Sequence, residues 1–278
     1  MLLIADSGST KTRWEFVQNG KSFTAYTSGI NPFYKNTEQI ITDLKKELLP
    51  QTTLKPDKIF FYGAGVSQPD KVETVRNALL AVFPAAEAEV EHDLLAAARA
   101  TCGNSPGIAC ILGTGSNSCL YDGAKIIDNV PSLGFILGDE GSGGYFGRKL
   151  LQVYYYREIP DDLKKSLEEK YDMKKDKVLN SIYTSPTPNQ VVAAYADFVT
   201  ANNKHPFIRA MLHDGFLDFF RRQPSKYPDF KNLPIHFIGS IAFLNQEILN
   251  GVMDELKLIK GVILKNPMEG LVKYHCRK

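Results

Sequence analysis

The sequence lacks any long hydrophobic run: no apolar stretch approaches the roughly 18 residues that cross a bilayer. It also opens directly on an apolar strand-like stretch, with no charged segment before it and no small-residue cleavage site after it. Such a start is unlike a secretory signal. We therefore expect a soluble, cytoplasmic protein with no membrane partner.

Cysteine is scarce, with four residues among 278. These residues form no CxxC pair, and no histidine stands beside them at the spacing of a metal site, which argues against structural zinc. Cys110 and Cys119 fall in apolar strand-like stretches, where we expect buried, reduced thiols.

An excess of charge of either sign is also missing. Lys and Arg number 33 against 31 Asp and Glu, which leaves a formal net charge of +2. Nucleic-acid-binding domains concentrate positive charge on one face. We therefore expect no nucleic-acid partner.

The sequence does contain a repeat. Residues 2–10 (LLIADSGST) resemble residues 108–116 (IACILGTGS), because each is an apolar strand that ends in small and hydroxyl-bearing residues. Each copy is followed by a strand, a turn and another strand, with turns at Asn19-Gly20 and Asp122-Gly123. These dipeptides favour two-residue hairpin turns. The shared plan indicates a duplicated domain.

Strands and helices alternate through the remainder of both halves. Helical spacing over 36–49 and 71–83 flanks a buried strand over 57–65, and Asn36 with Gln39 resembles a capping box. This alternation predicts an α/β fold whose largely parallel sheets are preceded by hairpins. The second half adds a long helical tract, interrupted by proline-rich stretches, before the strand–helix pattern resumes.

The predicted domain boundary lies near residues 101–107, between the two repeats. We expect an N-terminal domain over 1–105 and a C-terminal domain over 106–278 that contains the helical insertion. The last helix, after Pro267, could pack back on the N-terminal domain.

The opening turn is not a P-loop, because Lys11 follows Thr10 rather than glycine and a strand-like stretch comes next. A hairpin turn can still bind phosphate, since Gly8 lets the backbone approach closely and Ser9, Thr10 and Thr12 offer hydroxyls. An ordinary polar turn is the alternative. The second glycine-rich turn, 113–117 (GTGSN), favours phosphate, since two such turns could grip a polyphosphate together.

Asp6 ends the first strand, directly before this turn. A carboxylate there suits Mg²⁺, which keeps several waters and takes only one or two protein carboxylates besides substrate phosphates. A turn-capping aspartate is the alternative.

These motifs resemble those of the acetate and sugar kinase/Hsp70/actin superfamily. Residues 6–12 (DSGSTKT) resemble its first phosphate motif, residues 112–118 (LGTGSNS) its second, and residues 237–242 (FIGSIA) its adenosine motif. Within the superfamily, residues 138–147 (GDEGSGGYFG) together with the second phosphate motif are similar to N-acetylglucosamine kinases of the BadF/BadG-type ATPase family.

This resemblance implies two ribonuclease-H-like (actin-like ATPase) domains with the active site in the cleft between them. It implies transfer of the γ-phosphoryl group of ATP, with Mg²⁺, to the 6-hydroxyl of an amino sugar. The residues that it assigns to the phosphates are Gly8, Ser9, Thr10, Lys11, Thr12, Gly113, Thr114, Gly115 and Ser116, and those that it assigns to adenosine are Gly239 and Ser240.

The resemblance makes Asp93 the general base. This residue lies between a strand end and a helix start, where the helix N-terminus stabilises a carboxylate. An ionised aspartate can orient and deprotonate a sugar hydroxyl in line with the γ-phosphate. The alternative is that Asp93 only caps the helix.

The resemblance also assigns the sugar site. Asp139 and Glu140 stand between glycines in a turn after an apolar stretch, and packing alone does not explain two acids there. The resemblance implies that Asp139 hydrogen-bonds the sugar hydroxyls. It also implies that Glu140, Asn31, Thr114 and Gly115 contact the sugar.

The sequence departs from the family in one place. The family carries a Trp in the loop before this acidic motif, where this sequence has Leu133. Glucosamine and N-acetylmuramic acid therefore stay open beside N-acetylglucosamine.

Three other functions share parts of this pattern. They are a dehydratase-activating ATPase with an iron–sulfur cluster, for which only Cys102 is suitably placed, a type III pantothenate kinase, and a nucleotide-dependent sensor or polymer subunit without kinase activity. The resemblance also makes a homodimer plausible.

Overall fold

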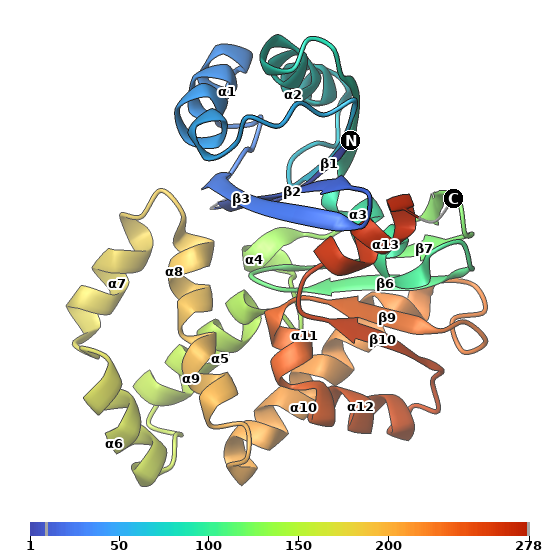
Figure 1. The fold of residues 1–278 in the computed structure, drawn as a ribbon. Coiled ribbons are helices and arrows are strands. Elements are labelled where there is room, and N and C mark those ends of the chain that lie inside the picture. Colours follow the sequence, from blue (N-terminus) through green and yellow to red (C-terminus); the bar gives the residue numbers. More distant parts are fainter. Residues whose placement is uncertain (9–10, 277–278) are drawn as a thin grey trace. The chain divides into compact units, whose positions relative to one another are not determined.

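The computed structural model describes residues 1–8 and 11–276, which form two compact units (Figure 1). Unit 1 comprises Met1–Gly103 and Pro267–Lys278, and unit 2 comprises Asn104–Asn266. The chain thus leaves unit 1 after Gly103 and returns to it at Pro267. Each unit contains one five-stranded sheet with helices packed against it, which confirms the α/β prediction.

The sheet of unit 1 has the strand order β3-β2-β1-β4-β5. β1 is antiparallel to β2 and parallel to β4, while β3 is antiparallel to β2 and β5 is parallel to β4. The strands are β1 (Leu2–Ser7), β2 (Lys11–Gln18), β3 (Lys21–Ser28), β4 (Lys58–Gly63) and β5 (Glu87–His92). Asn19 and Gly20 form the two-residue β2–β3 turn with φ angles of 51° and 75°, as predicted.

The helices of unit 1 follow the predicted spacing. They are α1 (Thr37–Asp43), α2 (Pro69–Val82), α3 (Asp93–Cys102) and α13 (Met268–Cys276). The capping box is confirmed: the Asn36 side chain accepts from Gln39 N, and the Gln39 side chain accepts from Asn36 N, each at 2.9 Å. Beyond α1 the chain continues as a π-helical segment (Leu44–Leu48) and a 3₁₀ turn (Leu49–Gln51).

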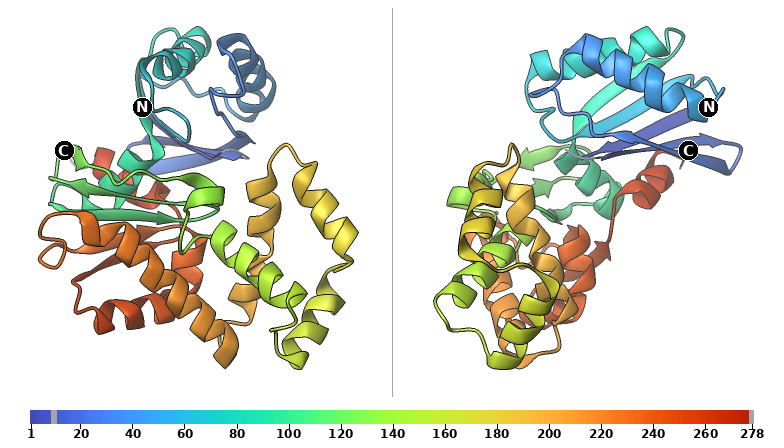
Figure 2. Two further views of the ribbon diagram at one scale, coloured as in Figure 1. Left: turned by 180° about the vertical axis from the view of Figure 1, so that it is seen from behind. Right: turned by 90° about the vertical axis from the view of Figure 1, so that its left-hand side faces the viewer.

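The two faces of this sheet bury different helices (Figure 2). Trp14 and Phe16 belong to the core that includes Ile40 of α1 and Leu79 of α2. On the opposite face Ile4, Phe60 and Tyr62 pack with α3 and α13, through Ala96, Met268 and Leu271. The alternation along β1 and β4 follows from the period of two in a strand.

The sheet of unit 2 repeats this topology. Its order is β10-β9-β6-β7-β8, with β6 antiparallel to β7 and parallel to β9, and with β8 antiparallel to β7 and β10 parallel to β9. The strands are β6 (Gly107–Leu112), β7 (Ser116–Tyr121), β8 (Ile126–Asp128), β9 (Ile235–Ile238) and β10 (Lys260–Leu264). Both sheets therefore show the same order and directions, as a duplication requires.

The second predicted hairpin turn differs from the first. Four residues, 122–125, connect β7 to β8, and the Asp122 side chain accepts from Ala124 N and Lys125 N at 2.8 Å each. The local side-chain bonds stabilise a wider turn, so the two-residue turn predicted at Asp122-Gly123 is wrong.

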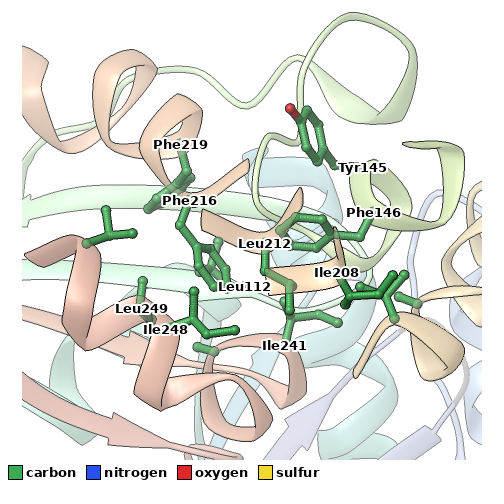
Figure 3. Close-up of a cluster of buried hydrophobic side chains, with 14 of the residues drawn as sticks. Leu112, Tyr145, Phe146, Ile208, Leu212, Phe216, Phe219, Ile241, Ile248 and Leu249 are labelled. Atoms are coloured by element: carbon green, nitrogen blue, oxygen red, sulfur yellow. The ribbon is translucent and has the colours of Figure 1, made fainter. Parts of the chain in front are cut away.

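Helices make up most of the rest of unit 2. They are α4 (Gly134–Leu137), α5 (Gly143–Tyr155), α6 (Asp161–Lys170), α7 (Lys175–Tyr183), α8 (Pro188–Ala194), α9 (Ala196–Ala201), α10 (Pro206–Arg222), a 3₁₀ turn (Pro224–Lys226), α11 (Ser240–Leu244) and α12 (Gln246–Glu255). Figure 3 shows the core beneath them, where Phe146 of α5 meets Phe216 of α10 edge-on with 5.4 Å between ring centroids. Of the described helices, none combines the length and the apolar character needed to cross a bilayer.

Candidate active site

The opening turn of unit 1 is held by internal hydrogen bonds. Gly8 N donates to Lys11 O at 3.0 Å, and the buried hydroxyls of Ser7 and Thr12 lie 2.8 Å apart. Thr12 is fully buried and also donates to Ser28 O, so its hydroxyl supports the turn from within. Lys11 Nζ lies 3.6 Å from the centroid of the Tyr26 ring. The other predicted phosphate ligands of this turn, Ser9 and Thr10, lie outside the described residues.

The Asn31 loop is bonded to the same turn. Ile30 N donates to Ser7 Oγ at 3.0 Å, and Asn31 Oδ1 accepts from Phe33 N at 2.9 Å. A Cβ on Gly65 would lie 2.6 Å from Asn31 Oδ1, so the amide lies directly on that glycine. The structure therefore brings the predicted sugar ligand Asn31 and the opening turn into one hydrogen-bonded group.

Asp93 is the first residue of α3, and it does not cap the helix. His92 holds the N-cap position, where its Nδ1 accepts from Leu95 N at 3.3 Å. The capping alternative for Asp93 is therefore wrong. Burial raises the pKa of the Asp93 carboxyl, while His92 and the Leu94 backbone N–H act in the opposite direction. A carboxylate with a raised pKa is a stronger base than an exposed aspartate.

Asp6 lies near Asp93 at the ends of β1 and β5. Burial, and after it the charge of Asp93, raise the pKa of Asp6 to about 6, while Arg13 opposes the shift. Two carboxylates whose pKa burial raises suit a divalent cation, which favours their charged forms. No group of three or more His, Cys, Asp or Glu among the described residues could hold a metal ion. Mg²⁺ needs no such group, because water and phosphate complete its shell.

The second glycine-rich turn lies in unit 2 and is fixed by α5. Gly113 N donates to Gly115 O at 3.0 Å, which closes the turn between β6 and β7. The first N–H groups of α5 then donate to its carbonyls, Gly143 N to Gly113 O at 2.8 Å and Gly144 N to Thr114 O at 2.9 Å. The carbonyls of Gly113 and Thr114 are thus satisfied by α5.

Asp139 completes the fixation of this turn. Its Oδ1 accepts from Ser116 N at 3.1 Å and from Ser132 Oγ at 3.2 Å, and the residue is 9% exposed. A Cβ on Gly115 would lie 2.9 Å from Asp139 Oδ2, so the carboxylate covers that glycine. Burial raises the pKa of Asp139, against the effects of the Ser116 N–H, Ser132 and Arg148.

Glu140 has a partner in the same unit. Arg222 Nε, at the end of α10, lies 3.1 Å from Glu140 Oε1. Asp139 and Glu140 both line a pocket of about 460 Å³, together with Leu133 and Leu137. The predicted sugar ligands Thr114, Gly115, Asp139 and Glu140 therefore lie together, with Glu140 already ion-paired.

The predicted adenosine ligands also lie beside the second turn. Gly239 joins β9 to α11 with a φ of 125°, and a Cβ there would lie 2.1 Å from Leu112 O and 3.1 Å from Gly113 N. Only glycine fits this close approach. Ser240 follows as the first residue of α11.

Sequence reasoning missed several supporting residues. His92, Ser132 and Arg148 hold the predicted ligands or act on their charge, and only His92, directly before Asp93, stands beside a predicted ligand in the sequence. Arg148 lies nine residues after Asp139, so only the fold brings it near.

One solved structure resembles the whole chain. It is a putative N-acetylglucosamine kinase from Porphyromonas gingivalis, 42% identical, with a TM-score of 0.94 over 99% of this chain and 98% of that one. This chain belongs to the same family of N-acetylglucosamine kinase-like proteins. The resemblance predicted from the motifs is thereby confirmed.

More distant structures share the fold of this kinase-like family. A putative N-acetylglucosamine kinase from Chromobacterium violaceum is 17% identical, with a TM-score of 0.72 over 98% of each chain. A non-polymerising mutant of MamK is 13% identical, with a TM-score of 0.53 over 99% of this chain and 97% of that one. These confirm the predicted actin-like fold class and nothing more. No protein-family model matches the sequence, and no curated protein sequence does.

Proposed function

We propose that this protein is an ATP-dependent kinase of the BadF/BadG type that phosphorylates an amino sugar, with N-acetylglucosamine at its 6-hydroxyl as the leading acceptor. The observation that carries the proposal is the 42% identity over 99% of the chain with a protein named for that activity. Asp93 supports it, because a buried carboxylate with a raised pKa suits a general base.

The proposed reaction is an in-line transfer. The acceptor oxygen forms a bond to the γ-phosphorus of ATP as the bond from that phosphorus to the ADP oxygen breaks. The proton of the acceptor hydroxyl passes to the Asp93 carboxylate, whose raised pKa favours the transfer. Asp139 and Asn31 would orient the sugar through their side-chain oxygens.

The remaining predicted residues would bind the nucleotide. In this proposal the glycine-rich turns contact the phosphates, Gly239 and Ser240 contact adenosine, and Asp6 holds Mg²⁺. The bound ion would neutralise phosphate charge. Glu140 keeps Arg222 in place beside Asp139 and has a supporting role, because its carboxylate is already paired. A homodimer and a cytoplasmic location complete the proposal.

The test is phosphoryl transfer from ATP, followed by ³¹P NMR of the product across amino sugars, hexoses and pantothenate. Asp93→Asn should lower kcat by about 10²–10⁴-fold, the usual contribution of a positioned base, and should leave ADP affinity nearly unchanged. Asp70→Asn, on the exposed start of α2, is the matched control and should retain full activity.

Two results would contradict the proposal. Failure of the wild-type protein to phosphorylate any amino sugar would remove the activity itself, and ATP hydrolysis without transfer would favour an ATPase. A large loss of ADP affinity in Asp93→Asn would instead show that Asp93 holds the nucleotide or its metal.

A further inference from the structure

A pocket of about 800 Å³ lies in unit 2 among α4, α5, α7 and α8. Among the described residues, none that is assigned to the proposed reaction lines it. Its volume falls within the roughly 300–1,000 Å³ of small-molecule sites.

The surface of this pocket is mainly apolar. Val178 and Val192 are only 3% and 7% exposed and line its buried side. Large side chains remain in water on its open side, where Ile136, Tyr156 and Tyr183 are 72%, 71% and 82% exposed. A concave apolar surface bordered by exposed apolar side chains is typical of a binding site, because an apolar ligand would remove that area from water.

The charged residues of the pocket are both cations. Arg148, on α5, and Lys175, the first residue of α7, line it, and no carboxylate from the described part of the chain does. A negatively charged group in the pocket would gain from both cations without facing an acid. A neutral ligand of the same shape would lack this gain.

We propose that this pocket binds an organic anion with an apolar body, of which a medium-chain fatty carboxylate is the simplest example. The alkyl chain would cover Val178, Val192 and the neighbouring aromatic rings, and the carboxylate would lie between Arg148 and Lys175. The lining of this pocket includes none of the predicted nucleotide and sugar ligands of unit 2.

The same pocket adjoins the segment that leads into Asp139 and Glu140. Phe135 and Ile136 of α4 form part of its lining, and Arg148 Nη1 donates to Phe135 O at 2.6 Å and to Ile136 O at 3.4 Å. α4 leads through Gly138 directly into Asp139. A ligand carboxylate that attracts Arg148 would compete with these carbonyls and shift the segment before Asp139. Bound anion should therefore change acceptor affinity, and by linkage the acceptor should change anion affinity equally; this second consequence rests on the proposed function.

The test uses the full chain and calorimetric titration with octanoate and with octanamide, its neutral isostere. Octanoate should bind to the wild-type protein, and octanamide should bind at least about tenfold more weakly, a difference of about 1.4 kcal/mol. Lys175→Glu should weaken octanoate binding at least as much. Lys174→Glu, the exposed neighbour that does not line the pocket, is the matched control and should bind octanoate almost as the wild type does.

Three outcomes would overturn the proposal: no octanoate binding at millimolar concentration, equal binding of octanamide, or equal loss in the two lysine variants. These titrations measure binding directly, so they test the anion site even if the protein phosphorylates no amino sugar. The consequence for the acceptor is tested separately, by the acceptor KM with and without octanoate, and an unchanged KM would overturn that part.

Discussion

At the scale of single residues, the structural role of Asp139 can be separated from its proposed role in sugar binding. Its Oδ1 holds the Ser116 N–H, and its backbone φ of 61° lies in the left-handed region. Asparagine tolerates that region and can still accept from Ser116, whereas alanine does neither. Structural and sugar-binding roles should therefore respond differently to the two substitutions.

We expect Asp139→Ala to lower the free energy of unfolding by about 1–3 kcal/mol, because it leaves a buried N–H without its acceptor. Asp139→Asn should stay near wild-type stability and raise the acceptor KM, because it loses the charge that strengthens bonds to sugar hydroxyls. Denaturant unfolding followed by circular dichroism gives the first quantity and initial rates give the second. Equal destabilisation by both variants would show that charge, rather than the hydrogen bond, fixes the turn.

The site residues show which features could be predicted from the sequence and which could not. Asp93 lies between a strand and a helix, as expected. The N-cap residue is His92, which is a less common capping residue. The partners of Asp139 were hidden because Ser132 and Arg148 reach it only through the folded loop. Whether Asp93 and Asp139 act as base and sugar ligand stays a prediction.

At the scale of elements, the turns and helix caps that short sequence motifs favour strongly were the most predictable. Asn19-Gly20 gave the expected turn, since both residues adopt positive φ, and the Asn36 capping box formed as expected. Asp122-Gly123 failed, because the aspartate side chain bonds to the backbone ahead of it and widens the loop. The π-helical segment after α1 could not be predicted, because the spacing of its apolar residues fits an α-helix equally well.

The packing of α13 against α3 gives a test at this scale. A Cβ on Gly270 would lie 2.3 Å from Ala100 O, so the two helices approach closely there. Gly270→Ala should lower stability by about 1–3 kcal/mol through overpacking. In α12 a Cβ on Gly251 would meet nothing within 4 Å, so Gly251→Ala should raise stability by about 0.5–1 kcal/mol through helix propensity.

Thermal unfolding of both glycine variants checks this prediction. Opposite signs are expected from the same chemical change. A stabilising Gly270→Ala would mean that α13 can move away from α3 at little cost.

At the scale of the whole molecule, the duplication was the most informative pattern. Two turns of similar composition predicted two sheets with one topology, and the strand orders agree. The packing of the last helix on the N-terminal domain was a possibility that amphipathic spacing alone could not decide, because such spacing shows that a helix has a buried face without showing what covers it.

The return of the chain through α13 gives unit 1 a histidine whose titration should depend on folding. Arg99 donates to the Tyr62 hydroxyl at 2.7 Å, and this hydroxyl lies 2.8 Å from His275 Nε2 on α13. Burial, with Arg99 and Lys58 nearby, lowers the pKa of His275 to about 4. At His275 the unfolded chain therefore binds more protons than the folded one between pH 6.5 and 4, so the contribution of this residue to stability should fall as pH falls through that window. Asp6 acts in the opposite direction, because its pKa is raised in the folded chain.

His275→Phe should flatten this dependence, because it keeps an aromatic ring against Phe60, whose centroid lies 3.6 Å from that of His275, and cannot take up a proton. Urea unfolding of both proteins between pH 4 and 7.5 provides the comparison. An identical pH dependence in the variant would assign the acid sensitivity to other groups.

The position of α13 also bears on the order in which the protein is made. Met268 and Leu271 cover Ile4 and Phe60, so this face of β1 and β4 stays uncovered until α13 has been synthesised. Unit 2, by contrast, is continuous and has all of its residues before α13 leaves the ribosome. Domains generally fold as units during synthesis, and an uncovered apolar sheet face is prone to aggregate. Unit 1, whose strands are translated before unit 2, should therefore finish folding after unit 2. Until then it would depend more on chaperones.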